Sequence, residues 1–159
     1  MPADVEPVLD KWVQLRGSGT LSASERQTLA RAIATHGEKA PKLYRGVNMK
    51  ATAKTFQKGQ AIDFGPVSAS EDQYSAAPYA ESGDDQSVLF VLDGAKGLNV
   101  QNRAEESAGF GEQEWITSGR FYVQSQGTDE DGNMLIRVGP RLGSDPVSQK
   151  NAGKKPLKL

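Results

Sequence analysis

The sequence has no cysteine and a single histidine, His36, among its 159 residues. Without cysteine the chain can form no disulfide, no thiolate metal site and no cysteine nucleophile. Because there is only one histidine, most kinds of zinc site are excluded, and a Ser-His-Asp triad would have to use His36 as its base. His36 falls in the last turn of an expected helix, where its interaction with the helix dipole explains it better than catalysis does. We therefore expect no metal and chemistry carried by other side chains.

The sequence also lacks a strong net charge and long apolar runs. Its formal net charge is -1, so no overall field attracts nucleic acid or an anionic membrane. No apolar run approaches the roughly 20 residues of a transmembrane helix, and no basic segment followed by an apolar one marks a signal peptide. With 36% hydrophobic and 25% charged residues, the composition is that of a globular protein. We expect a soluble, cytoplasmic monomer that does not contact membranes.

Residues 1–40 carry the pattern of a helical N-terminal lobe. Apolar residues recur at helical spacing over residues 4–16. Ser22 and Glu25 have the spacing of a capping box, which predicts the start of a second helix. That helix is expected to stop at Gly37, where glycine can adopt a left-handed cap.

The remaining residues predict strands, one short helix and a polar end, so the fold class is α+β. A single domain is expected over residues 1–142, with the helical lobe packed on a sheet core at 41–142. Residues 143–159 are polar, rich in lysine and without periodicity, which indicates a flexible basic tail with at most weak nucleic-acid contact. Strands are expected at residues 43–47, 61–64, 67–70, 87–92, 98–100, 112–123 and 134–138. The strand at 112–123 is expected to contain a turn at Ser118-Gly119. Its end, residues 120–124, is expected to pair with residues 134–138 as a hairpin.

Two carboxylates, Glu112 and Glu114, open one of the expected strands, directly after a loop rich in small residues. Side chains two apart on a strand share a face, so the two like charges repel unless a cation or a ligand separates them. The simplest interpretation of such a pair is the solvent-exposed face of an edge strand. Two other parts of the sequence argue for more.

The first is Arg45 in an early strand, and the second is the pair Ser68 and Ser70. An arginine in a strand is commonly one half of a salt bridge, but its planar fork also matches a pair of phosphates. Ser68 and Ser70 share a strand face. Ser70 has a structural explanation as the cap of the following helix, whereas Ser68 is left without one.

Four pieces follow one another in the chain: Tyr44-Arg45-Gly46, Val67-Ser68-Ala69-Ser70, the expected strand Val88–Asp93 with Lys96-Gly97, and Phe110-Gly111-Glu112-Gln113-Glu114. Their order and spacing resemble those of the Arg-Ser-Glu group of mono-ADP-ribosyltransferases. That group includes bacterial toxins and bacteriophage enzymes. The resemblance extends from about Leu43 to Val138. This chain departs from the family pattern in having Ala69 where threonine is usual. It also has no arginine or lysine at 81–86, where several members place a cation on the cofactor phosphates.

The resemblance implies an ADP-ribosyltransferase-like fold in which two mostly antiparallel sheets form an NAD cleft. NAD is then the substrate that donates ADP-ribose. On the cofactor side, Arg45 grips the pyrophosphate, and Gly46 lets the backbone approach the nicotinamide amide. Ser68 and Ser70 belong to the same side, and Tyr79 corresponds to an aromatic that stacks on the nicotinamide; a core position on its helix would explain Tyr79 equally well.

For catalysis, the resemblance implies that Glu114 contacts the ribose of NAD and that Ser68 holds Glu114 in place. Arg45 also belongs to the implied catalytic residues. A carboxylate beside the oxocarbenium-like sugar stabilises the transition state more than the ground state. Glu112 corresponds to the acceptor-side residue, and a glutamate there accompanies transfer to arginine. Phe110 would pack against the acceptor or hold the loop.

The resemblance also implies partners and a setting. The expected partners are bacterial proteins with an exposed arginine, and the expected setting is a bacteriophage-encoded enzyme in the host cytoplasm or a delivered effector. Two alternatives stay open: an NAD glycohydrolase with water as the acceptor, and a non-catalytic binding module that kept the fold.

Overall fold

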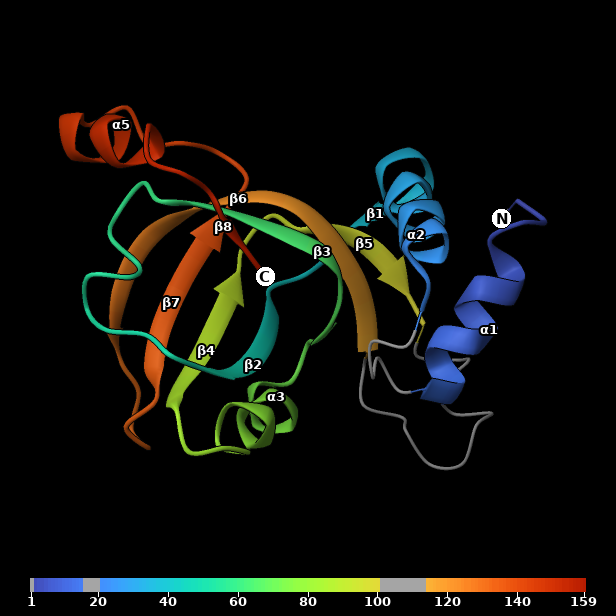
Figure 1. The fold of residues 1–159 in the computed structure, drawn as a ribbon, viewed down its shortest axis with the longest axis horizontal. Helices are drawn as coiled ribbons and strands as arrows, with labels where there is room; N and C mark the ends of the chain where they lie inside the picture. The colour runs from blue at the N-terminus through green and yellow to red at the C-terminus, as the bar shows by residue number, and fades with distance from the viewer. Residues whose placement is uncertain (1, 16–20, 101–113) are drawn as a thin grey trace.

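A computed structural model describes residues 2–15, 21–100 and 114–159 of the chain (Figure 1). These residues form an α+β fold, as predicted. The helices are α1 (Glu6–Leu15), α2 (Ala23–His36), α3 (Gln73–Ala80) and α5 (Pro146–Ala152), and the strands are β1 (Glu38–Lys39), β2 (Leu43–Met49), β3 (Ala61–Ser70), β4 (Gln86–Leu92), β5 (Lys96–Asn99), β6 (Glu114–Thr128), β7 (Met134–Gly139) and β8 (Leu157–Lys158).

The strands form one sheet in the order β1-β5-β6-β7-β4-β2-β3-β8, and it bends back on itself because β6 also pairs with β3. All pairings are antiparallel except β4 with β7 and β3 with β8. The mostly antiparallel pairing is as predicted, and the two expected sheets are two parts of this continuous sheet. Strand β6 joins them, since its first part pairs with β3 and β5 and its second part with β7.

Aromatic rings fill the space that the bent sheet encloses. Phe90 on β4 contacts Phe56 and Phe64 edge to face, each at a centroid distance of 5.4 Å, and Phe64 contacts Phe121 at 5.6 Å. All four rings are buried. Edge-to-face contacts of this kind add to the stabilisation from apolar burial, so the bent sheet is held from inside by contacts between its two parts.

The helical lobe packs on the outer face of the sheet, beside β5, as Figure 1 shows. Trp12 of α1 and Leu29 and Ile33 of α2 are buried in one cluster with Leu98 and Ile116 of β5 and β6. The predicted lobe is therefore confirmed. None of the helices in the described ranges is long and apolar enough to cross a membrane.

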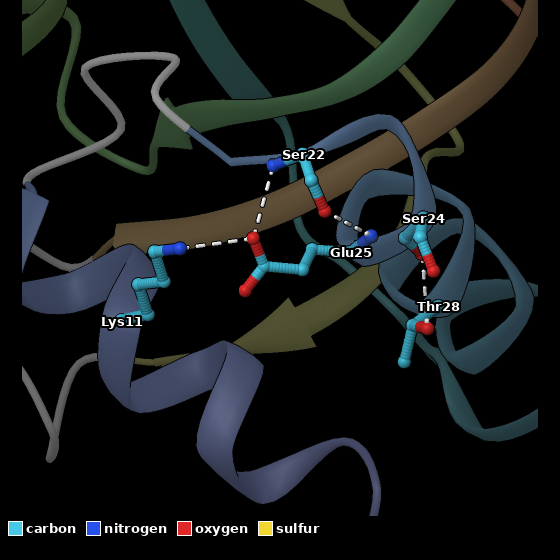
Figure 2. A network of polar contacts seen from close by, with 5 residues as sticks. All are labelled: Lys11, Ser22, Ser24, Glu25 and Thr28. Atoms are coloured by element: carbon cyan, nitrogen blue, oxygen red, sulfur yellow. Dashed lines mark hydrogen bonds and ion pairs between the residues drawn. The ribbon is translucent and has the colours of Figure 1, made fainter.

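A capping box fixes the start of α2 (Figure 2). The Glu25 N–H donates to Ser22 Oγ at 3.1 Å, and the Ser22 N–H donates to Glu25 Oε1 at 2.9 Å. Lys11 of α1 reaches the same Oε1 with its Nζ at 2.9 Å. The hydrogen bond from Ser22, followed by that from Lys11, lowers the pKa of Glu25. The predicted capping box is confirmed, and it also ties α1 to α2.

Three local predictions are wrong. The residue after α2, Gly37, has φ -63°, so it is extended and not left-handed. Ser118-Gly119 makes no turn: Gly119 has φ +119°, and β6 runs through it without a break. Ser70 does not cap α3, because Asp72 occupies the cap and accepts from the Tyr74 N–H. In each case a sheet pairing or a neighbouring side chain decides the local conformation in place of the residue's own preference.

The prediction of a flexible tail at residues 143–159 is also wrong. The segment holds α5, which Asp145 caps, and β8, which pairs with β3. Ser148 and Asn151 are buried, and the Asn151 side chain donates to the Lys58 carbonyl at 2.8 Å. Polar contacts of this kind order the segment. The prediction is wrong because it depends on apolar periodicity, which this segment lacks.

Removal of residues 143–159 is therefore expected to destabilise the protein. Besides the Asn151 contact, the segment accepts a hydrogen bond from Gln60 at the Lys155 carbonyl and donates one from the Leu159 N–H to the Asp63 carbonyl. At about 1 kcal/mol each, losing such bonds lowers the free energy of unfolding by roughly 2–4 kcal/mol, which urea denaturation measures. The double variant Lys150→Gln/Lys155→Gln, which removes charge at two exposed positions, is the control and should unfold like the parent. A truncated protein of unchanged stability would contradict the packed segment.

Candidate active site

Ser68 on β3 and Glu114 at the start of β6 are in direct contact. Ser68 Oγ donates to Glu114 Oε1 at 2.9 Å, in a half-buried position. The antiparallel register places Ser70 opposite Glu114 and Ser68 opposite Ile116. Residues opposite one another share a face, so these four side chains lie on one side of the sheet, which is the side that Ile116 buries against the helical lobe.

Arg45 approaches the same place from β2. Its Nη1 donates to the Ser68 carbonyl at 3.0 Å, while its buried Nε has no hydrogen-bond partner among the described residues. Burial, and then the positive charge of Arg26, lowers the pKa of Arg45 to about 10. The guanidinium therefore remains charged near neutral pH, with its buried Nε donor unused within the described residues. An unused buried donor on a cation is a costly arrangement that an anion would relieve.

Gly46, next to Arg45, is in close contact with α3. A Cβ at Gly46 would overlap the Ala76 carbonyl oxygen and lie 2.7 Å from the Ala80 nitrogen. The missing side chain thus lets α3 pack directly on β2. This packing accounts for the glycine, and its role toward a nicotinamide stays a prediction.

Ser70 and Tyr79 are the other two residues predicted on the cofactor side, one at the end of β3 and one on α3. Ser70 is buried, and its Oγ accepts from the Asp72 N–H at 3.0 Å, which shapes the turn from β3 into α3. Tyr79 is 56% exposed, so the interpretation of Tyr79 as a core residue is wrong and its ring is accessible. Glu112 and Phe110 lie outside the described residues.

No known family model and no curated protein matches the sequence. Solved structures do match it. The ADP-ribosyltransferase Vis, solved with an inhibitor called M6, superposes with a TM-score of 0.63 at 14% identity, covering 99% of this chain and 78% of Vis. Plx2a, an ADP-ribosyltransferase toxin from Paenibacillus larvae, has a TM-score of 0.57 at 13% identity, with 87% and 86% of the two chains covered. The chain has the ADP-ribosyltransferase fold.

Other matches to this fold carry ligands. Vis has also been solved with agmatine, in a structure that matches with a TM-score of 0.54 at 15% identity and covers 98% of this chain and 74% of Vis. Exoenzyme S from Pseudomonas aeruginosa, solved with human 14-3-3 protein beta and bound to carba-NAD, has a TM-score of 0.51 at 14% identity. That match covers 94% of this chain and 78% of exoenzyme S. Identities this low establish the ADP-ribosyltransferase fold, and the chemistry must be argued from the site.

Two contacts near the site were not expected from the sequence. Trp115 Nε1 donates to Glu71 Oε2 at 3.1 Å, which ties the end of β3 to the start of β6. Arg26 of α2 directs its Nη2 toward the Pro66 carbonyl at 3.5 Å. Neither contact could be predicted from the sequence, because the two partners lie in different elements and belong to no motif. Across the described residues, no group of acidic, histidine or cysteine side chains could hold a metal ion.

Gly46→Ala is expected to destabilise the protein, because the new methyl group would force α3 away from β2. Overpacking of this kind costs about 1–3 kcal/mol. Urea denaturation followed by circular dichroism would measure the loss. Gly127→Ala is the matched control, since a Cβ at Gly127 meets nothing within 4 Å. Equal stability of the two variants would contradict the close contact of α3 with Gly46.

Proposed function

We propose that this protein is a mono-ADP-ribosyltransferase that moves ADP-ribose from NAD to arginine side chains of target proteins and releases nicotinamide. One observation carries the proposal. Ser68, Glu114 and Arg45 belong to three separate strands, yet Ser68 Oγ bonds Glu114 and the Ser68 carbonyl bonds Arg45. This convergence occurs on the ADP-ribosyltransferase fold, where the sequence resemblance expects it.

Arg45 is proposed to bind the diphosphate of NAD. Its charge is near Ser68, its Nε has no hydrogen-bond partner within the described ranges, and a guanidinium fork suits phosphate oxygens. The carba-NAD bound to exoenzyme S supports an NAD-sized ligand on this fold. Tyr79 is accessible for stacking on the nicotinamide, and Ser70 and Gly46 lie next to Ser68 and Arg45, on the proposed cofactor side.

Glu114 is proposed to stabilise the reacting sugar. The bond between the nicotinamide nitrogen and C1′ of the ribose breaks with both electrons going to nicotinamide, which leaves as a neutral molecule. The positive charge then lies on the ribose as an oxocarbenium ion. A fixed carboxylate stabilises that charge, which is absent from the sugar in the ground state. The hydrogen bond from Ser68 would hold the Glu114 carboxylate in position.

Glu112 is proposed to receive the arginine of the target. A carboxylate pairs with a guanidinium and can take its proton as nitrogen attacks C1′. Phe110 would pack against the acceptor. The complex of Vis with agmatine supports a guanidinium acceptor, because agmatine ends in that group. We further propose bacterial target proteins and action in the cytoplasm, as a bacteriophage enzyme or a delivered effector.

The two alternatives make different use of the same site. An NAD glycohydrolase would need Arg45, Ser68 and Glu114 but no partner for a guanidinium, so Glu112 argues against it. A non-catalytic module would have no need of the hydrogen bond between Ser68 and Glu114. The absence of a cation at residues 81–86 is the one feature that favours such a module.

Glu114→Gln is expected to abolish transfer while preserving the fold. The amide oxygen can still accept from Ser68, but its lost charge should lower the rate by about 10²–10³-fold, a typical effect of removing one stabilising group. The measurement is labelling of a bacterial lysate with radiolabelled NAD, with protein melting followed in parallel. Discrete bands are expected for the parent protein and none for the variant. Equal labelling by both would contradict the role of Glu114.

Glu112→Gln is expected to separate transfer from hydrolysis. Without its carboxylate the acceptor loses its partner, while water can still capture the sugar cation. Release of nicotinamide and labelling of agmatine would be measured side by side, because agmatine does not depend on knowing the target. We expect loss of agmatine labelling with continued nicotinamide release. Unchanged agmatine labelling would show that Glu112 does not handle the acceptor.

A further inference from the structure

Two arginines from different parts of the fold meet along β3. Arg45 of β2 donates to the Ser68 carbonyl at 3.0 Å, and Arg26 of α2 lies 3.5 Å from the Pro66 carbonyl. Pro66 and Ser68 are two residues apart on β3. The two guanidinium groups are therefore held along the same short stretch of β3, next to Ser68.

Gly65 makes room for the guanidinium of Arg26. A Cβ at Gly65 would lie 2.8 Å from Arg26 Nη2, closer than such atoms can approach without a shift. Gly65 and Pro66 fall at the bulge of β3, where the register to β6 changes between Phe64 and Val67. A bulge re-aims the chain locally, and here the strand backbone at the bulge is in contact with a cation from the helical lobe.

Neither arginine has an acidic partner in the part of the chain that the structure describes. Within residues 2–15, 21–100 and 114–159, neither Arg26 nor Arg45 forms a salt bridge. The positive charge of Arg26 contributes, after burial, to lowering the pKa of Arg45, so the two guanidinium groups lie close enough to repel. The buried Nε of Arg45 also has no acceptor among these residues. Two neighbouring cations with an unused donor are unfavourable when no anion is bound. An anion with several oxygens could accept hydrogen bonds from both guanidinium groups.

We propose that Arg26 is a second binding residue for the diphosphate of NAD, supplied by the helical lobe. The inference rests on the proposed function and adds to it. Arg26 would serve as the cation that residues 81–86 lack. The capping box of Ser22 and Glu25, held by Lys11, fixes the turn from which Arg26 projects. The lobe would then have a part in cofactor binding as well as in packing.

The test compares Arg26→Gln with Arg31→Gln, which removes the same charge from an exposed position on the same helix. Titration calorimetry with NAD and with ADP-ribose would measure affinity. We expect Arg26→Gln to weaken both ligands by about tenfold, the scale of one charge-assisted hydrogen bond, and Arg31→Gln to leave both unchanged. Without ligand, Arg26→Gln should melt at the same temperature as the parent or higher, because a repulsion is removed.

Inorganic diphosphate separates this inference from the proposed function. In the first outcome, diphosphate raises the melting temperature of the parent and of Arg31→Gln but not that of Arg26→Gln. This result supports the anion site at Arg26 even when NAD does not bind, and in that case only the proposed function is wrong. If NAD binds the parent and Arg26→Gln equally, the inference is wrong and the proposed function remains. A parent protein that binds neither NAD nor diphosphate would overturn both.

Discussion

The pairing of β3 with β6 is the constraint on which the site depends. Its register sets Ser70 opposite Glu114 and puts Ser68 within hydrogen-bond distance of that carboxylate. A slip of one residue would turn Glu114 to the other face of the sheet. The same pairing bends the sheet around its aromatic core and carries Ile116 into the cluster with the helices. Fold and site are therefore fixed by one set of hydrogen bonds.

Positive charge without a matching acid is the second feature of the site. Elsewhere on the sheet an arginine is matched, as Arg120 is by the Asp63 carboxylate at 2.7 Å. Arg45 and Arg26 instead contact backbone carbonyls, which are neutral. Two guanidinium groups without an acidic partner among the described residues, close to a carboxylate held by a serine, support the proposal of a ligand with both negative charge and a reacting sugar. NAD has both parts.

The sequence predicted what local patterns determine and missed what distant contacts determine. The capping box at Ser22, the continuous apolar strand β4 and the ordered motifs at Arg45 and Ser68 could all be recognised from spacing. The packing of residues 143–159 could not, because buried polar side chains such as Asn151 fix it and no apolar period marks it. The position of Arg26 was missed for a related reason, since its contact with the Pro66 carbonyl depends on how the helical lobe docks on β3.

The most direct test of this account is a crystal structure of the protein with carba-NAD. The account predicts the diphosphate against the guanidinium of Arg45 and the nicotinamide-side ribose against Glu114, with Ser68 still bonded to that carboxylate. Ligand bound away from Ser68 and Glu114, or no ligand at concentrations that saturate exoenzyme S, would contradict it.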